Sequence, residues 1–124
     1  MRIRTLVIGI ALLSCSTLLY AQQGLLGTYT GAFRERGGEI PRRVSAILEI
    51  TSAENGKLAG KFKLSGGSCG GDYVIDGAYQ DSKLEMRTSE GALRGCGKDT
   101  LVLVPQDNKL VGTIGAESIE LQRK

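Results

Sequence analysis

The chain has 124 residues, of which 16 are Lys or Arg and 13 are Asp or Glu, so its formal net charge is +3. It contains no histidine and no tryptophan, and aromatic residues make up 5% of it. Without an imidazole there is no ready general base near neutral pH, and few aromatic side chains are available for stacking on nucleic acid bases. We therefore expect a protein that is not an enzyme and does not bind nucleic acid.

The first 21 residues are typical of a secretory signal peptide. Two arginines precede an apolar stretch over residues 5–13, and Ala21 provides a small residue at a cleavage point. The apolar stretch is too short for a transmembrane span. The sequence therefore predicts a signal peptide over residues 1–21 and a periplasmic or secreted protein. Cys15 offers an alternative, because Leu-Leu-Ser-Cys resembles the lipobox of bacterial lipoproteins, whose cysteine carries a lipid anchor.

Beyond the leader, apolar residues recur at every second position, which is typical of half-buried β-strands. In chain order the alternation predicts eight strands, near residues 25–34, 43–50, 57–64, 72–79, 83–88, 100–104, 110–114 and 118–122. Short turn sequences separate several of them, so we expect sequential antiparallel pairing. The prediction is an all-β fold, a single eight-stranded antiparallel up-and-down β-barrel within a domain of residues 22–124. A β-sandwich is the alternative.

Four of these strands carry a glycine between two apolar residues on the same face. The glycines are Gly27, Gly60, Gly77 and Gly112. Glycine weakens a strand unless a close backbone approach or a tight bend requires it. We therefore expect four structural glycines that face the interior of a tightly curved sheet.

The rhythm Leu-x-Gly-x-Tyr or Phe, as at residues 25–29, and a final strand around Ile119 and Leu121 resemble small calycin-type barrels. Avidins and compact lipocalin-like domains are the nearest members. The resemblance covers the mature chain, rests on a short motif, and implies a meander β-barrel. Avidins line their biotin site with tryptophans, and lipocalins place a Gly-x-Trp where this chain has Tyr29. The resemblance therefore implies a fold and no particular ligand.

Cys69 and Cys96 remain as an even pair once Cys15 is removed with the leader or carries lipid. In an oxidising compartment a disulfide between them is the expected outcome. It would close a loop of 27 residues and stabilise the fold by roughly 3 kcal/mol. A redox pair or a metal site is the alternative, but the chain has no Cys-x-x-Cys motif and no histidine. We expect no cofactor and no metal.

The long loops of a meander of this length fall at one end of the barrel. They cover residues 34–42, 65–71 and 89–99, and they hold both cysteines of the pair. Arginine, the main cation of these loops, suits bidentate contact with carboxylates or phosphates. The candidate binding residues are Arg34, Arg36, Arg42, Arg43, Arg94 and Lys98. A solvated rim of mixed charge is the alternative interpretation.

These patterns predict an exported, non-enzymatic binding module. We expect it to recognise or inhibit a macromolecular partner, such as a secreted hydrolase, through the loops at one barrel end. One alternative is a carrier of a small apolar ligand inside the barrel, which an internal pocket above roughly 300 Å³ would favour. Another is a structural envelope protein. The partner, whether a protein or a small molecule, and the oligomeric state are left open by the sequence.

Overall fold

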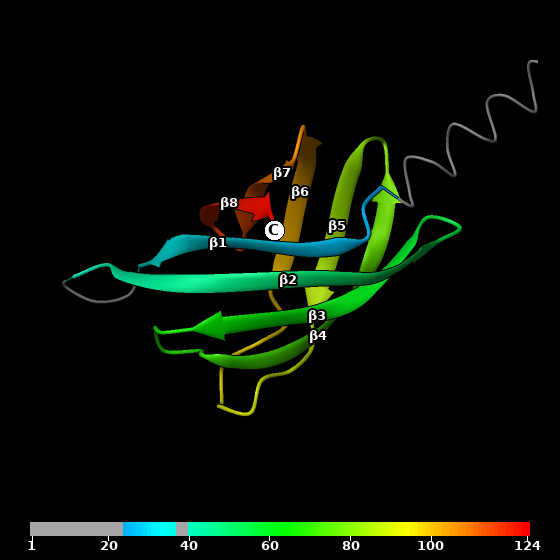
Figure 1. Cartoon of the computed structure of the whole chain (residues 1–124). Coiled ribbons are helices and arrows are strands. Elements are labelled where there is room, and N and C mark those ends of the chain that lie inside the picture. The colour runs from blue at the N-terminus through cyan, green and yellow to red at the C-terminus, as the bar shows by residue number, and fades with distance from the viewer. Residues whose placement is uncertain (1–23, 37–39) are drawn as a thin grey trace, which may run out of the picture.

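The computed structural model of the chain describes residues 24–36 and 40–124; the predicted signal peptide and Cys15 lie outside the described residues. Each strand pairs antiparallel with the next one, as Figure 1 shows. The strands are β1 (Gly27–Glu35), β2 (Arg42–Glu54), β3 (Lys57–Ser65), β4 (Gly71–Gln80), β5 (Lys83–Thr88), β6 (Thr100–Gln106), β7 (Lys109–Ile114) and β8 (Glu117–Arg123). None of the described residues forms a helix long and apolar enough to cross a membrane.

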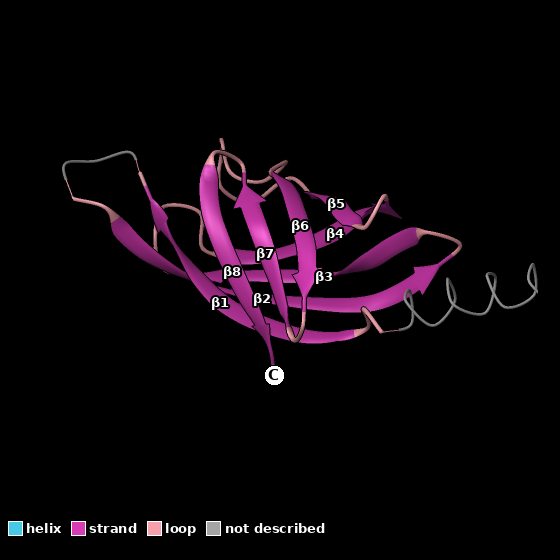
Figure 2. Ribbon diagram, turned by 90° about the horizontal axis from the view of Figure 1, so that it is seen from above, coloured by secondary structure: helices cyan, strands magenta, loops and turns pink. Residues whose placement is uncertain are grey.

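Pairing between β1 and β8 closes the sheet into a barrel (Figure 2). The register places Tyr29 opposite Arg123 and Ala32 opposite Glu120. Closure gives every strand two neighbours, which removes the exposed edges that an open sheet would leave. The predicted up-and-down barrel is therefore confirmed, and the β-sandwich alternative is excluded.

Inward positions at every second residue form one continuous hydrophobic core, which explains why the alternation located the strands. The fully buried large side chains are Tyr29, Leu48, Ile50, Phe62, Ile75, Leu84, Met86, Leu101, Leu103, Leu110 and Leu121. Burial of each such side chain contributes about 1.5–3 kcal/mol to folding. The interior of the barrel is thus occupied by packed side chains contributed by all eight strands.

Three of the predicted structural glycines lie at inward positions where the backbone of the neighbouring strand takes the space of a side chain. These are Gly60, Gly77 and Gly112. An ideal Cβ on each would overlap with a carbonyl oxygen of a neighbouring strand, namely that of Glu49, Glu85 and Val102, respectively. The sheet curves so tightly at these points that only a residue without a Cβ fits.

Gly27 differs from this prediction. A Cβ there would lie 3.8 Å from Nη1 of Arg123, which is an ordinary contact, and the φ of Gly27 is +143°. Glycine is favoured at this position by the backbone conformation and not by crowding. The crowded glycine of β1 is Gly31, where a Cβ would overlap with the carbonyl oxygen of Glu120 in β8. Gly31 lies at the seam that closes the barrel, and it also stands between two apolar residues of the same face, Tyr29 and Phe33.

β2 continues to Glu54, four residues beyond its predicted end. The register between β2 and β3 shifts between Ile50 and Ser52, which marks a β-bulge. Because of the extra residue, Ile50 and Ala53 are both buried although they are three positions apart. The period of two breaks at the bulge, and the sequence pattern therefore ended the strand too early.

The barrel end opposite the long loops is covered by Arg123. Its guanidinium lies 5.1 Å from the centroid of the Tyr29 ring, and its Nη2 donates to the Tyr29 hydroxyl at 2.6 Å and to the carbonyl oxygen of Gly24. The Tyr29 hydroxyl in turn donates to the carbonyl oxygen of Leu25 at 2.9 Å. Burial raises the pKa of Tyr29, although the charge of Arg123 acts in the opposite direction. These contacts tie the chain before β1 to the end of β8, and the long loops lie at the other end of the barrel.

Candidate binding site at the barrel mouth

A disulfide staples two of the long loops at this end. Cys69, in the turn after β3, is bonded to Cys96, in the loop between β5 and β6, and their Cα atoms are 5.4 Å apart. The predicted pairing of the two cysteines is therefore confirmed. The hydroxyl of Tyr73 donates to the carbonyl oxygen of Cys69 at 2.6 Å, which anchors the stapled turn to a residue of the core.

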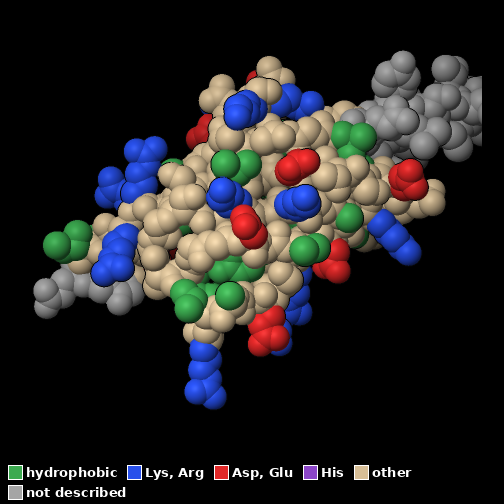
Figure 3. All heavy atoms as spheres, turned by 60° about the horizontal axis from the view of Figure 1, so that its bottom comes forward, with side chains coloured by type: hydrophobic (Ala, Val, Ile, Leu, Met, Phe, Trp, Pro, Cys, Tyr) green, Lys and Arg blue, Asp and Glu red, His purple; other side chains and the backbone are tan. Residues whose placement is uncertain are grey.

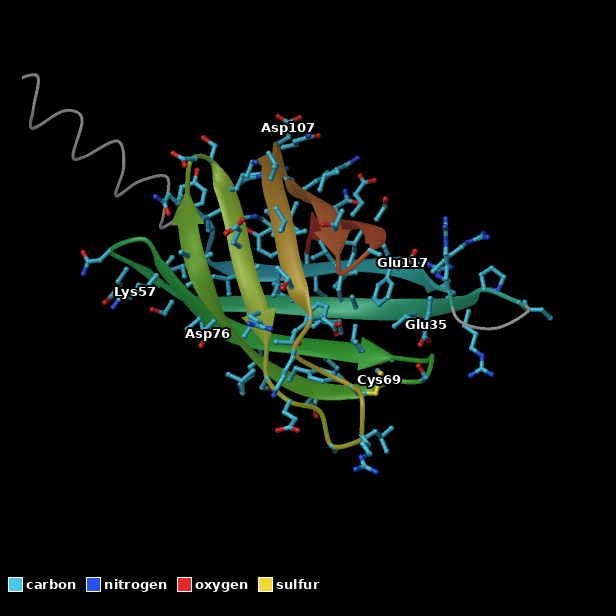
Figure 4. All side chains as sticks on the ribbon, turned by 180° about the vertical axis from the view of Figure 1, so that it is seen from behind. Glu35, Lys57, Cys69, Asp76, Asp107 and Glu117 are labelled. Atoms are coloured by element: carbon cyan, nitrogen blue, oxygen red, sulfur yellow. A yellow bond between two sulfur atoms is a disulfide. The ribbon has the colours of Figure 1, made fainter. Side chains whose placement is uncertain are left out.

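Side-chain contacts tie the end of β1 to the β3–β4 turn and to the start of β8. Glu35 accepts hydrogen bonds from the backbone N–H of Ser68, at 2.9 Å, and from the Ser68 hydroxyl. Arg36 Nε lies 3.6 Å from Glu117 Oε2, at the start of β8. Figure 4 shows Glu35, Glu117 and Cys69 at one end of the molecule and Lys57 at the opposite end. All four connections at the loop end are thus linked to one another.

The segment between β5 and β6, predicted as a long loop, is held by its own backbone hydrogen bonds. The N–H of Lys98 donates to the Ser89 carbonyl oxygen at 3.1 Å, and the N–H of Gly91 donates to the Cys96 carbonyl oxygen at 2.9 Å. Glu90 and Gly97 form an isolated antiparallel bridge. The segment therefore extends the β5–β6 pair as a narrow hairpin and presents a preformed surface.

A pocket of about 210 Å³ opens between these connections; it is called the mouth pocket below. Its apolar lining comes from Phe33, Val44, Leu64 and Ile114, of which the last three belong to the buried core. Its charged lining comes from Glu35, Arg36, Asp99 and Glu117. The mouth pocket is therefore the open top of the barrel core, with an apolar floor and charged walls.

Three strand ends place a carboxylate on the inward face. Glu35 in β1, Asp99 directly before β6 and Glu117 in β8 each lie two residues from an inward apolar side chain, namely Phe33, Leu101 and Ile119, respectively. Side chains two apart share a face. These carboxylates lie one step past the strands predicted from the alternation, so extending the period of two by that step identifies them, whereas the loop pattern pointed to the arginines.

The three carboxylates lie in different electrostatic environments. The hydrogen bond from the Ser68 hydroxyl, and then that from the Ser68 N–H, lower the pKa of Glu35. Burial raises the pKa of Asp99. Burial also raises the pKa of Tyr73, with a further contribution from the nearby charge of Asp99. The surroundings therefore favour the ionised form of Glu35 and disfavour that of Asp99.

The backbone of Asp99, and not its side chain, makes its hydrogen bonds. Its N–H donates to the Thr88 hydroxyl at 2.8 Å, and its carbonyl oxygen accepts from the Thr88 N–H at 3.0 Å. Among the described residues, no hydrogen bond or ion pair involves its carboxylate. In the same part of the chain no three side chains of metal-binding types converge to hold an ion. The carboxylates of the pocket are thus separate groups.

The predicted binding cations surround the mouth pocket. Of the six, the structure places Arg36 alone in the pocket lining. The others are exposed: Arg34, Arg42 and Arg43 lie on the ends of β1 and β2, and Arg94 and Lys98 lie on the β5–β6 hairpin. Arg34 and Arg43 lie opposite each other in the ladder. The loop end therefore combines acidic pocket walls with a basic surround.

A second hollow, of about 430 Å³, lies on the outer face of β2, β3 and β4. Ile47 and Val74 contribute apolar surface to it, and Val74 is 64% exposed. Lys63 lies directly opposite Asp72, so the two charge signs alternate across the strands. Figure 3 shows basic, acidic and hydrophobic side chains interspersed on one face of the molecule. Such a balanced surface is ordinary for a soluble face and does not favour one ligand class.

Comparisons of the chain with protein families, with curated proteins and with solved structures found no match. The role of the mouth pocket is therefore argued from its own geometry and chemistry.

Proposed function

We propose that the protein is an exported, non-enzymatic binding module that recognises a macromolecular partner through the loop end of its barrel. The observation that carries this proposal is the cross-tied set of connections around the mouth pocket, where the disulfide, the Ser68–Glu35 hydrogen bonds and the Arg36–Glu117 ion pair meet. The β3–β4 and β5–β6 connections are held by the disulfide and by backbone hydrogen bonds, so they would lose little conformational entropy when a partner docks. Rigid loops on a barrel are a common way to present a binding surface.

The proposal includes export to the periplasm or beyond, or anchoring through Cys15. A disulfide between Cys69 and Cys96 is compatible with an oxidising compartment. The leader pattern of residues 1–21 supports the same destination. The up-and-down connectivity is also what a calycin-type barrel would have, so a relationship to that group is part of the proposal.

The carrier alternative has less support. The mouth pocket, at about 210 Å³, is smaller than the roughly 300–1,000 Å³ of typical small-molecule sites. Below it the interior is occupied by side chains such as Leu48, Phe62 and Met86, which are at most 2% exposed. A pocket of this size suits a single side chain that projects from a larger partner.

A pull-down tests the proposal. The exported protein with its disulfide intact is used as bait for periplasmic and culture-supernatant proteins. One variant changes Arg36, Arg42 and Arg43 to serine at the loop end. A matched control changes Lys57, Lys61 and Lys83 to serine, which removes the same charge from exposed positions away from the mouth pocket.

We expect the arginine variant to lose the captured partner and the lysine variant to retain it. Exposed charges contribute little to stability, so both variants should fold. The salt dependence of binding should also flatten in the arginine variant alone, because cationic contacts are lost. Equal capture by the parent and the arginine variant would move the site away from the loop end. Saturable binding of an apolar dye inside the barrel would then favour the carrier.

A further inference from the structure

We propose that the mouth pocket receives one lysine or arginine side chain of a protein partner. This inference rests on the proposed function and specifies the chemistry of the partner. Its basis is a pocket that ends on the hydrophobic core, carries three carboxylates on its walls, and includes one carboxylate without a partner among the described residues.

The shape of the pocket matches a long side chain with an apolar stem. Phe33, Val44, Leu64 and Ile114 form the apolar floor, and the volume of about 210 Å³ leaves no room for a large ligand. Lysine and arginine bury their methylene groups against apolar surface while the charged head contacts polar groups. The stem would therefore pack on the floor of the pocket, and the head would remain among the carboxylates.

The charge of the pocket selects a cation. Glu35, Asp99 and Glu117 line it against the single guanidinium of Arg36, whose side chain is 83% exposed. Glu35 is already hydrogen-bonded to Ser68, and Glu117 is already paired with Arg36. The Asp99 carboxylate has no such contact, and its burial disfavours the ionised form. A bound ammonium or guanidinium would supply the charge compensation that Asp99 lacks.

The surround of the pocket adds a second requirement. Arg34, Arg42 and Arg43 are exposed on the adjacent strand ends, and Arg94 and Lys98 are exposed on the β5–β6 hairpin. A basic side chain on a basic surface would be repelled by this surround, whereas one that projects from an acidic surface would be attracted by it. The partner is therefore expected to present a lone lysine or arginine surrounded by carboxylates.

The test uses capped single amino acids as probes and the exported, disulfide-bonded protein as receptor. Nα-acetyl-lysine methylamide and the corresponding arginine compound are titrated in the millimolar range and followed by amide NMR shifts. Capped norleucine is the neutral match for the lysine stem, and capped glutamate has the opposite charge. A free alkylamine, n-butylamine, represents the other source of the same chemistry.

Both cationic probes should shift amides around the mouth pocket, and capped norleucine should bind at least about tenfold more weakly than capped lysine. Asp99→Asn should weaken the binding of capped lysine by about tenfold. The backbone of Asp99 makes the hydrogen bonds with Thr88, so this variant should keep the fold. Asp76→Asn, at an exposed position that Figure 4 places away from Glu35 and Glu117, is the matched control and should bind as the parent does.

Several results would overturn the inference. These are no shift with either cationic probe, norleucine binding equal to that of lysine, preference for glutamate, or equal binding by Asp99→Asn and Asp76→Asn. Tighter binding of n-butylamine than of capped lysine would assign the pocket to a free amine and not to a partner side chain. If Asp99→Asn were misfolded by NMR, Glu117→Gln would replace it, with the same expected direction.

The two proposals fail in different ways. If capped lysine binds at the mouth pocket and the pull-down captures nothing that depends on the loop end, the pocket chemistry stands and the macromolecular function does not. If a captured partner depends on the arginines but neither cationic probe shifts the mouth pocket, the function stands and the present inference is wrong.

Discussion

Replacement of Gly60 by alanine should destabilise the barrel strongly, although it adds a single methyl group. An ideal Cβ at this position would overlap with the Glu49 carbonyl oxygen and lie 3.0 Å from the Glu49 carbonyl carbon and 3.1 Å from the Ile50 Cα. All three atoms belong to the backbone of β2, so no side-chain rotation can relieve the contact. Either β2 and β3 have to separate at this point, or β3 has to become less curved.

The expected magnitude follows from the kind of atom that must move. Overpacking of a core costs about 1–3 kcal/mol, and the upper part of that range applies when a backbone must shift. For a domain of about 100 residues, 3 kcal/mol corresponds to a fall in Tm of about 12–24 °C. Gly70→Ala is the matched control, because the nearest atoms to its Cβ, the carbonyl oxygens of Gly66 and Leu64, lie 3.5 Å away. Its stability should be unchanged or higher, since alanine lowers the entropy of the unfolded chain.

Urea denaturation followed by circular dichroism measures both variants against the parent. The reasoning requires the urea midpoint of Gly60→Ala to fall well below that of Gly70→Ala at an equal slope of free energy against urea. Coincident midpoints for the two variants would refute the inferred crowding at Gly60, and with it the tight curvature that we assign to β3.

Three further outcomes are expected. Replacing Cys69 and Cys96 by serine should cost roughly 3 kcal/mol in urea denaturation. A thiol assay on the denatured, unreduced mature protein, without the leader that holds Cys15, should read near zero, whereas two thiols per chain would contradict the disulfide. Burial raises the pKa of Asp99, so ionisation of Asp99 destabilises the fold as the pH rises through its folded pKa. Asp99→Asn should therefore match or exceed the parent in Tm at neutral pH and lose any advantage below pH ~3.9. A variant that is less stable than the parent at neutral pH would contradict this. The Ser68 hydrogen bonds lower the pKa of Glu35, so the stability that they contribute is present above the unfolded pKa of Glu35 and is lost as the pH falls through its folded pKa. In Ser68→Ala, NMR titration should show a Glu35 pKa closer to its ordinary value. An unchanged Glu35 pKa would exclude Ser68 as the cause.

Much of the fold follows from local patterning. Seven of the eight strands lie within a few residues of their predicted positions, because each has one face toward the core and one toward solvent. The end of the barrel that carries the long loops follows as well, since turns after alternate strands of a meander share an end. The Cys69–Cys96 pair was predicted on separate grounds, from the even cysteine count that remains beyond the leader. The exception is β2, whose bulge after Ile50 moves Ala53 onto the inward face and breaks the period.

The residues of the mouth pocket follow less directly from the sequence than the strands do. Arg36, Arg42 and Arg43 were selected as loop cations, but the structure places one of them in the pocket lining and the other two around it. Glu35 and Asp99 were overlooked as pocket residues because they lie where the strand pattern ends. Applying the alternation one residue pair further would have assigned both to the inward face. It would not have shown that the two faces meet in one pocket.

The sequence by itself determined which residues face inward, because side-chain alternation is a property of a single strand and apolar residues mark its buried face. The tertiary structure decided how those faces meet. Closure between β1 and β8 brings Glu35 beside Glu117, which is far away in the chain, and the crowding at Gly31 appears only where the two strands pair. Curvature and closure depend on all eight strands together. The mouth pocket, which results from them, therefore cannot be predicted from the sequence pattern of any single strand.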